Sequence, residues 1–205
     1  VHTTGDKKGQ SSMSHELRTP LNGILGYAQL VELEEGLPAQ LRDHAHAITA
    51  AGHHLLAVVN DILDLTRIES GQLTIQVAPI DVAPLLAATI SHHEAAARQR
   101  DIRLVTTGSD ASLRVLADEH RLRQVLDNLV SNAIKYNQSN GQVSLIVTQS
   151  ASDRVRFTVT DTGRGIAPEL QAELFQPFNR LGAETGTIQG IGIGLLITRH
   201  LVDGM

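Results

Sequence analysis

A heptad repeat constrains the fold of this chain more than any other feature of its sequence. Apolar or small residues recur there at alternating spacings of four and three: Leu41, Ala45, Ile48, Gly52, Leu55, Val59, Ile62 and Thr66. This spacing is typical of helices that pack nearly parallel in a bundle. Leu56 and Leu63 widen the stripe beyond a two-stranded seam, as the core of a four-helix bundle requires. The repeat therefore predicts one long helix of a bundle.

A second amphipathic helix precedes the repeat, with an apolar face formed by Leu17, Leu21, Ile24, Leu25, Ala28 and Val31. Gly36 and Pro38, in the intervening EEGLPAQ segment, are helix stop and restart signals. We expect an antiparallel helical hairpin over about residues 11–70. Two helices cannot surround a core, which favours a homodimeric four-helix bundle. The alternative is that both helices pack onto the rest of the same chain.

The sequence periodicity changes after Gly71. Strand-like segments (LTIQVAPID, IRLVTTG, LRVLAD, QVSLIVTQ, RVRFTVTD) alternate with helix-like ones (VAPLLAATISHHEAAARQR, HRLRQVLDNLVSNAIKY, PELQAELFQPF, GIGIGLLITRHLV). A mixed region after a purely helical one predicts a second domain with an α/β sandwich fold. We expect a linker remnant over 1–10, a helical dimerisation domain over 11–72, and a second domain over 73–205.

Composition narrows the classes of function. The 205 residues carry a formal net charge of −5, with 17 basic residues that form no long block, so nucleic-acid binding is disfavoured. The chain has no cysteine, which excludes disulfides, thiolate metal sites and a cysteine nucleophile. No apolar run approaches the roughly 20 residues of a membrane span. We expect a cytoplasmic fragment that makes no membrane contact.

The window MSHELRTPLNG could carry nucleophilic chemistry, because His15 is followed directly by Glu16 and, one helical turn later, by Thr19. A neutral imidazole can attack phosphorus with one nitrogen if the proton on the other is removed, and an adjacent carboxylate can take that proton. A hydroxyl one turn on can hold a water for the reverse, hydrolytic reaction. Pro20 should loosen or kink this helix. The alternative is that His15 is an ordinary surface residue.

A second candidate site lies on the helix near residue 130. Asn128 and Asn132, four residues apart, offer amide oxygens on one face for Mg²⁺ and phosphate. Lys135 can neutralise phosphate charge and Tyr136 can pack against a base. The alternative for this helix is a polar stripe on its surface.

Two glycine-containing segments complete the candidate nucleotide site. In DTGRGI, Asp161 can accept a hydrogen bond from an adenine amino group, while Gly163 and Gly165 let the backbone turn closely around a planar ring. A plain turn after a strand is the alternative. The second segment has glycines before an apolar helix, whose N-terminal N–H groups can bind phosphate: Gly190, Gly192 and Gly194. It lacks the Gly-Lys-Ser/Thr of a P-loop.

Together, and in this order, these segments resemble the sensor histidine kinases of two-component signalling. SHELRTPLNG looks like their H box, DEHRLRQVLDNLVSNAIKYN like their N box, and DTGRGI and GIGIGLLI like their two glycine boxes. FQPFNR is similar to their F box. The resemblance extends from about Ser12 to Asp203 and implies a HisKA-type phosphotransfer hairpin followed by an ATP-binding domain of the Bergerat fold.

The resemblance also implies a role for each candidate residue. His15 would be the phosphorylated nucleophile, Glu16 its proton acceptor and Thr19 a residue of the phosphatase reaction. ATP and Mg²⁺ would be bound by the N-box and first glycine-box residues, which are Asn128, Asn132, Lys135, Tyr136, Asp161, Gly163 and Gly165. Phe175 and Phe178 would anchor a lid formed by the stretch after Arg180, itself a candidate phosphate contact, with Gly190, Gly192 and Gly194 as its hinge. The partners of the chain would be a second copy of itself, in a homodimer, and the receiver domain of a response regulator.

Three departures from the family pattern keep other functions in view. Ile191 replaces the usual Thr or Ser of the second glycine box, GDKKGQSS replaces a Phe-containing helix, and the family usually continues past Met205 with closing strands. We therefore expect a truncated ATP domain, and a degenerate kinase that acts as a dimerising regulatory module is one alternative. A stand-alone ATPase of the Bergerat group is another.

The remaining histidines include adjacent pairs such as His92–His93. Neighbours on a helix point in different directions, so no metal site is predicted from them.

Overall fold

The computed structural model describes residues 6–108, 112–151, 153–181 and 190–205, and their side chains apart from those of residues 6–15 and 151. It divides the chain into two compact units, Val1–Leu73 and Thr74–Met205.

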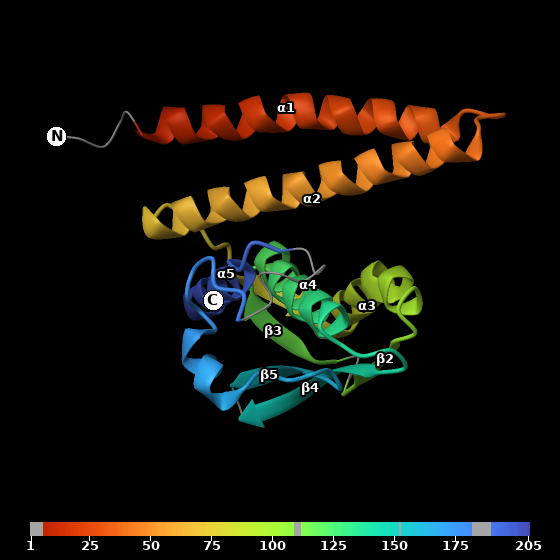
Figure 1. Cartoon of the computed structure of the whole chain (residues 1–205). Helices are drawn as coiled ribbons and strands as arrows, with labels where there is room; N and C mark the ends of the chain where they lie inside the picture. The colour runs from red at the N-terminus through yellow and green to blue at the C-terminus, as the bar shows by residue number, and fades with distance from the viewer. Residues whose placement is uncertain (1–5, 109–111, 152, 182–189) are drawn as a thin grey trace. The chain divides into compact units, whose positions relative to one another are not determined.

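The first unit is a hairpin of two long helices, α1 (Asp6–Leu33) and α2 (Ala39–Glu69), which lie side by side (Figure 1). The turn between them contains Gly36 with φ 83°, a left-handed conformation that favours glycine. The predicted antiparallel hairpin is confirmed. α1 begins at Asp6, so residues 6–10 of the expected linker are helical and extend α1. The helix also continues through Pro20.

The two helices meet through small residues on α2 and larger ones on α1. Leu21, Leu25 and Ala28 are buried on α1, and Ala45 and Gly52 on α2. A Cβ on Gly52 would lie 2.7 Å from the Cδ2 atom of Leu25, so the glycine lets the leucine approach the α2 backbone. The small residues of the heptad thus face the intramolecular partner.

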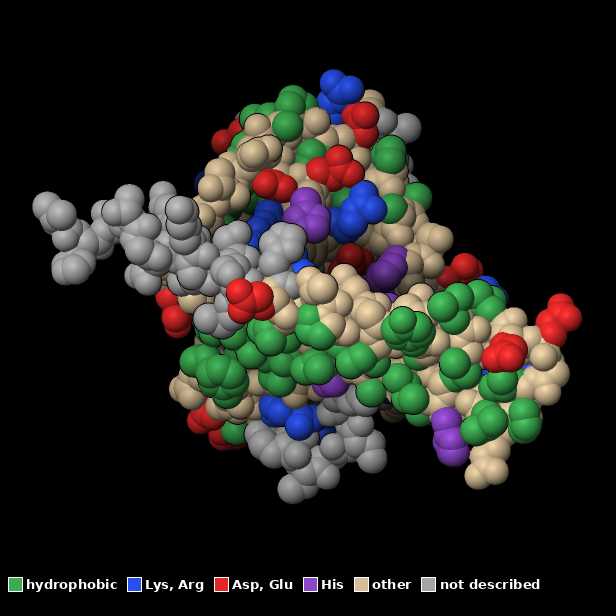
Figure 2. Space-filling model, turned by 90° about the horizontal axis from the view of Figure 1, so that it is seen from above, with side chains coloured by type: hydrophobic (Ala, Val, Ile, Leu, Met, Phe, Trp, Pro, Cys, Tyr) green, Lys and Arg blue, Asp and Glu red, His purple; other side chains and the backbone are tan. Residues whose placement is uncertain are grey.

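The large residues of the same heptad are exposed. Leu41, Ile48, Leu55 and Ile62 recur every seven residues on α2, and each is 44–52% exposed. Leu17, Ile24 and Val31 form a second exposed row with the same spacing on α1. Figure 2 shows hydrophobic side chains gathered in a band along the hairpin. We refer to these seven residues as the apolar rows.

The second unit alternates strands and helices. Its strands are β1 (Ala78–Asp81), β2 (Arg103–Thr107), β3 (Arg114–Ala117), β4 (Gln142–Ala151) and β5 (Arg154–Asp161). Its helices are α3 (Val82–Arg98), α4 (Glu119–Lys135), the 3₁₀ helix η1 (Pro168–Glu173) and α5 (Gly194–Gly204).

Two sheets form. β4 lies between β2, to which it is parallel, and β5, to which it is antiparallel, while β1 and β3 pair separately as antiparallel strands. Val143, Leu145 and Val147 alternate along β4 and are buried. Helices α3 and α4 cover that face of the sheet (Figure 1), so the predicted α/β sandwich is confirmed.

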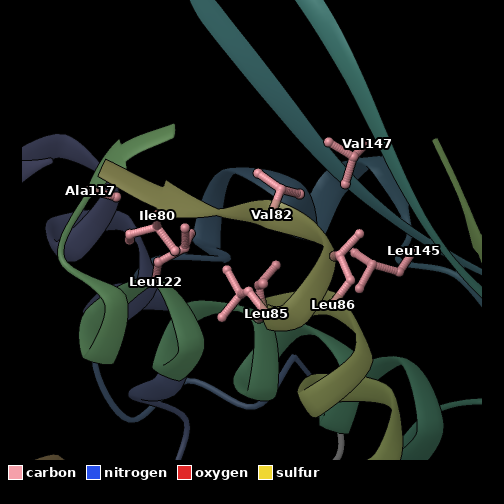
Figure 3. Close-up of a cluster of buried hydrophobic side chains, with 9 residues drawn as sticks. Ile80, Val82, Leu85, Leu86, Ala117, Leu122, Leu145 and Val147 are labelled. Carbon is pink, nitrogen blue, oxygen red and sulfur yellow. The ribbon is translucent and has the colours of Figure 1, made fainter. Parts of the chain in front are cut away.

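The core of this unit lies between β4 and the helices α3 and α4. Val82, Leu85 and Leu86 of α3 pack with Leu145 and Val147 of β4 (Figure 3). Leu126 of α4 belongs to the same cluster and is 1% exposed. Aliphatic side chains thus fix α4, which carries the N-box residues, against the sheet.

The first predicted strand is shorter than expected, because LTIQVAPID is extended in a ladder only over Ala78–Asp81. Ala78 pairs with Ala117, and the next residue on the β3 side, Asp118, caps α4. The backbone N–H of Gln76 donates to the Asp118 carboxylate at 2.9 Å. Residues 73–77 therefore have no strand to pair with on that side.

The predicted helix PELQAELFQPF is also shorter than expected, and is a 3₁₀ helix over Pro168–Glu173. None of its residues is buried, so no apolar face rewards a longer helix. Pro177 and the positive φ of 64° at Phe178 are incompatible with its continuation.

Asp118 stabilises the start of α4, and its replacement should be measurable. Its carboxylate accepts from the N–H of Gln76 and from the N–H of Arg121 at 3.2 Å. Asp118→Ala should lower the free energy of unfolding by about 1 kcal/mol at pH 7, as loss of a helix N-cap does. Urea unfolding of the two proteins measures the difference, and equal midpoints would contradict it.

The hydrogen bond from Gln76 to Asp118 also predicts that the free energy of unfolding depends on pH. The Gln76 N–H holds the pKa of Asp118 below its ordinary value, more than burial raises it. The stabilisation is therefore present above the unfolded-state pKa of about 3.9 and is lost as the pH falls through the lower folded-state pKa. Asp118→Asn should remove this dependence while keeping a capping oxygen.

Among the described residues, no helix combines the length and the hydropathy that crossing a bilayer requires.

Candidate functional site

The H box lies on α1, which carries His15, Glu16 and Thr19 within little more than one helical turn. Glu16 and Thr19 are exposed. The side chain of His15 lies outside the described part of the chain. The candidate phosphoacceptor residues thus occupy the first unit, and the candidate nucleotide residues occupy the second.

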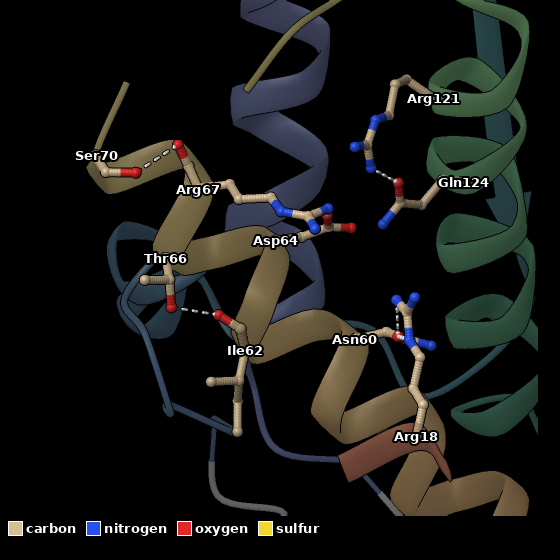
Figure 4. Close-up of polar contacts among 9 residues, drawn as sticks. All are labelled: Arg18, Asn60, Ile62, Asp64, Thr66, Arg67, Ser70, Arg121 and Gln124. Atoms are coloured by element: carbon tan, nitrogen blue, oxygen red, sulfur yellow. Dashed lines mark hydrogen bonds and ion pairs between the residues drawn. The ribbon is translucent and has the colours of Figure 1, made fainter. Parts of the chain in front are cut away.

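Arg18, three residues after His15, ties this part of α1 to α2. Its Nε and Nη2 atoms donate to Oδ1 of Asn60 at 3.1 and 2.6 Å (Figure 4). A guanidinium that donates twice to one amide oxygen restricts the relative shift of the two helices. The contact fixes the level at which the H box lies along the hairpin.

Asn128 on α4 is held in one orientation by α5. Its Nδ2 atom donates to Oγ1 of Thr198 at 2.8 Å, and Thr198 is 9% exposed. A Cβ on Gly194 would lie 2.5 Å from Oδ1 of Asn128, so the third glycine of GIGIG leaves room for that oxygen. The structure therefore brings the N box and the second glycine box together, with the amide oxygen of Asn128 beside Gly194.

The rest of the N box continues along the same helix. Asn132 Nδ2 donates to Asn128 Oδ1 at 3.5 Å, so both amides share one face of α4. Lys135 closes the helix and is half-buried, and its backbone carbonyl accepts from Nη1 of Arg100 at 3.1 Å.

The first glycine box meets the end of α4. A Cβ on Gly163 would lie 2.4 Å from the backbone oxygen of Tyr136, so only glycine permits this approach. The Gly163 N–H donates to Oδ1 of Asp161 at 2.8 Å, which fixes the carboxylate at the end of β5. The Arg164 guanidinium lies over the Tyr136 ring at 5.5 Å. Gly165 has φ 67°, where glycine is favoured.

Asn137 makes a second connection between these segments. Its Oδ1 atom accepts from Oγ1 of Thr162 at 3.1 Å, and its Nδ2 atom donates to the carbonyl of Gln142 at 3.1 Å. Asp161 is exposed beside this network. The Asp161 carboxylate, at the end of β5 and next to a glycine turn, can accept a hydrogen bond from an amino group on the edge of a base.

The F box packs against the second glycine box. Gly192 has φ 76°, and a Cβ there would lie 2.6 Å from the backbone oxygen of Asn179. The Asn179 side chain donates to Glu173 at 2.6 Å and accepts from the N–H of Leu181 at 2.9 Å. Phe175 lies 5.1 Å from the Arg199 guanidinium of α5.

Other F-box and lid residues are less constrained by described contacts. Phe178 is 64% exposed and Arg180 is half-buried. Gly190 has φ 152°. The predicted lid is the stretch after Arg180, and its residues 182–189 lie outside the described part of the chain.

Sequence reasoning missed three polar residues that support the candidate motifs, namely Asn60, Asn137 and Thr198. Each contacts a residue at least 25 positions away, which no local spacing reveals, although Asn137 also donates to the carbonyl of the nearby Gln142. Thr198 left a weak signal, since it is a polar residue on the otherwise apolar face of GLLITRHLV.

Two family profiles match the chain. Residues 10–71 match the "His Kinase A (phospho-acceptor) domain", and residues 117–205 match the "Histidine kinase-, DNA gyrase B-, and HSP90-like ATPase".

Curated relatives match along nearly the whole chain. "Sensor protein TorS" of Escherichia coli (strain K12) is 40% identical over 200 residues, which are 95% of this chain and 21% of TorS. "Signal transduction histidine-protein kinase BarA" of the same strain is 35% identical over 201 residues, which are 95% of this chain and 22% of BarA. The chain thus spans about a fifth of the length of these relatives.

Two solved structures of histidine kinases are also similar to this chain. Full-length ShkA, crystallised in complex with AMPPNP, is 36% identical with a TM-score of 0.76, covering 97% of this chain and 41% of ShkA. The catalytic domain of histidine kinase ThkA is 30% identical with a TM-score of 0.55, covering 63% of this chain and 81% of that domain. From its phosphoacceptor hairpin to its ATP-binding fold, the chain belongs to the sensor histidine kinases and corresponds to their catalytic core.

Proposed function

We propose that this chain is a protein-histidine kinase core that transfers the γ-phosphoryl group of ATP to His15. The observation that carries the proposal is the meeting of the nucleotide motifs: Asn128 with Gly194, and Tyr136 with Gly163. These contacts join the N box to both glycine boxes, on a chain whose other unit bears the H box. A chain with an H box and no nucleotide site would support a regulatory module. A chain with a nucleotide site and no H box would support a stand-alone ATPase.

The adenine end of the site would be formed by Asp161, Tyr136 and the turn at Gly163 and Gly165. Asp161 would accept from the adenine amino group with the carboxylate oxygen that Gly163 does not occupy. The turn has no Cβ at Gly163 or Gly165, so the backbone can approach a planar ring.

The phosphate end would be formed by α4 and the glycine hinge. The oxygen of Asn128, oriented through Thr198, and the oxygen of Asn132 fit Mg²⁺, which prefers oxygen ligands. Mg²⁺ bound there would offset the negative charge of the triphosphate. Lys135 and Arg180 would neutralise phosphate oxygens, and the lid would turn on Gly190, Gly192 and Gly194.

In the proposed reaction, an imidazole nitrogen of His15 forms a bond to the γ-phosphorus. The bond between that phosphorus and the oxygen bridging to the β-phosphate breaks, and ADP leaves. Glu16 takes the proton from the other nitrogen, which keeps the attacking nitrogen electron-rich. Phosphoryl transfer depends mainly on positioning and on charge neutralisation, which these residues can supply.

Incubation with γ-labelled ATP and Mg²⁺ tests the activity. We expect label in the protein that is lost in acid and stable in alkali, as a phosphoramidate is. Ile191 lacks the hydroxyl that a Thr or Ser would offer to phosphate, which favours the degenerate regulatory module as second candidate. Binding of AMPPNP without any labelling would support that candidate, and labelling would exclude it.

We further propose that the hairpin forms a homodimeric four-helix bundle, because the apolar rows extend from Leu17 to Val31 on α1 and from Leu41 to Ile62 on α2 and would be covered by a second copy. The phosphoryl group of His15 would pass to an aspartate in the receiver domain of a response regulator. We propose a cytoplasmic location, where ATP is available.

Thr19 should separate two activities. Its exposed hydroxyl lies one helical turn beyond His15, where it can hold a water for hydrolysis of the regulator's phosphoaspartate. Thr19→Ala should reduce dephosphorylation about 100-fold or more, within the range for loss of one positioned catalytic group, while autophosphorylation changes little. Autophosphorylation is measured with γ-labelled ATP and dephosphorylation with the labelled phosphorylated regulator, and an equal loss of both would contradict the proposed role.

A further inference from the structure

Three potential metal ligands converge where α3 packs against α4. They are His92 and His93 of α3 and Asp127 of α4, and one ligand atom from each lies within 4.8 Å of the others. His93 Nε2 and Asp127 Oδ1 are 3.1 Å apart. The two imidazole rings meet edge to face, with their centroids 4.8 Å apart. Adjacent histidines of one helix thus gather around a third ligand from another.

The separations are close to those of a real metal site. With bonds of about 2.0–2.1 Å to a tetrahedral Zn²⁺, ligand atoms lie about 3.3 Å from one another. The His93–Asp127 pair is already at that separation. His92 is exposed, so its ring can turn toward the pair without disturbing the core. A shift of about 1.5 Å would bring the widest separation to that of a tetrahedral site.

Burial differs among the three ligands in a way that suits a bound ion. His93 is 8% exposed and is fixed by packing, whereas the Asp127 side chain is 31% exposed and His92 faces solvent. The fixed ligand would orient the site, and the exposed side would admit the ion together with a water as fourth ligand.

The donor set selects a class of metal. Two imidazole nitrogens and one carboxylate oxygen suit Zn²⁺, Cu²⁺ or Ni²⁺, whereas Mg²⁺ prefers oxygen ligands alone. We propose that His92, His93 and Asp127 form a site for a divalent transition-metal ion such as Zn²⁺, distinct from the proposed Mg²⁺ site of Asn128 and Asn132. The bound ion would join α3 to the helix that carries Asn128.

Zinc titration of the full chain by isothermal calorimetry, after treatment with a chelator, tests this site. The informative variant is His92→Ala, which removes an exposed ligand. The matched control is His53→Ala, which removes an exposed histidine from the other adjacent pair, His53–His54. We expect one Zn²⁺ site in the wild type and in the control, and an affinity at least about 10-fold lower in His92→Ala.

Two further measurements keep the result decisive. Co²⁺ absorbs visible light and Zn²⁺ does not. With Co²⁺ added in place of Zn²⁺, the wild type and the control should therefore show a visible absorption band, and this band should be weaker in His92→Ala and in Asp127→Asn. Circular dichroism shows whether each variant is folded. Zinc affinity that is equal in His92→Ala and the wild type, or a wild type that takes up no Zn²⁺, would overturn the proposal.

Discussion

Replacing Ile48 and Leu55 by glutamate should convert the proposed dimer to a monomer. Both residues belong to the apolar row of α2 and are 49% and 52% exposed in the single chain. Because each is only about half exposed, covering one such side chain contributes about 0.8–1.5 kcal/mol. The two chains of a dimer would lose four of them, on the order of 3–6 kcal/mol, which weakens association by about 10²- to 10⁴-fold. Sedimentation or light scattering gives the mass directly.

The heptad supplies a matched control for this variant. Ala50 and Ala57 are also seven residues apart and exposed on α2, but each lies two positions beyond a row residue, on another face of the helix. A double glutamate variant at these alanines adds the same charge and should stay dimeric. If both double variants have the mass of the wild type, the apolar rows are not the dimer interface.

Asp161→Asn should lower the affinity for ATP about 10- to 100-fold. The substitution keeps an oxygen to accept from the Gly163 N–H, which is 2.8 Å from Asp161 Oδ1. The other carboxylate oxygen becomes an NH₂ group, which cannot accept from the adenine amino group. Loss of a hydrogen bond to a charged group costs about 1.5–3 kcal/mol, which corresponds to this range.

Calorimetric titration with AMPPNP measures the effect. Asp153→Asn, which neutralises an exposed carboxylate between β4 and β5, serves as control and should bind as the wild type does. Unchanged affinity in Asp161→Asn would show that adenine is recognised elsewhere.

The hairpin could be predicted from the sequence because the heptad repeat places apolar and small residues on one stripe of a long helix. The repeat alone does not show which of these residues pack against α1 and which stay exposed. In the structure Ala45 and Gly52 face α1, and large residues of the same repeat, such as Ile48 and Leu55, are exposed. A glycine in a helical seam can be understood only after Leu25 is seen against it.

The nucleotide motifs could be identified from sequence because each needs a particular residue type at a fixed local spacing. The residues that hold the motif side chains in place could not be identified from sequence, because each acts on a partner far along the chain. Thr198 acts on Asn128 across 70 residues, and Asn60 acts on Arg18 across 42. His92 and His93 gave no metal signal by themselves, since their third ligand, Asp127, comes from the next helix.

Local signals also overstated regular structure where tertiary partners were lacking. Residues 73–77 alternate like a strand, yet Gln76 bonds to the helix-capping Asp118 and not to a neighbouring strand. The segment after Ala167 has helical residues but no buried face, and it forms only a 3₁₀ helix. In both places packing decides the outcome, and the sequence pattern does not report it.

In the proposed reaction, ATP bound by the second unit phosphorylates His15. The most direct test is labelling with γ-labelled ATP in the wild type and in His15→Gln, followed by mapping of the labelled peptide. His44→Gln, at another exposed histidine of the hairpin, is the control. We expect acid-labile label on the peptide that contains His15, undiminished in the control and absent from His15→Gln. Label that persists at the wild-type level in His15→Gln would contradict the account.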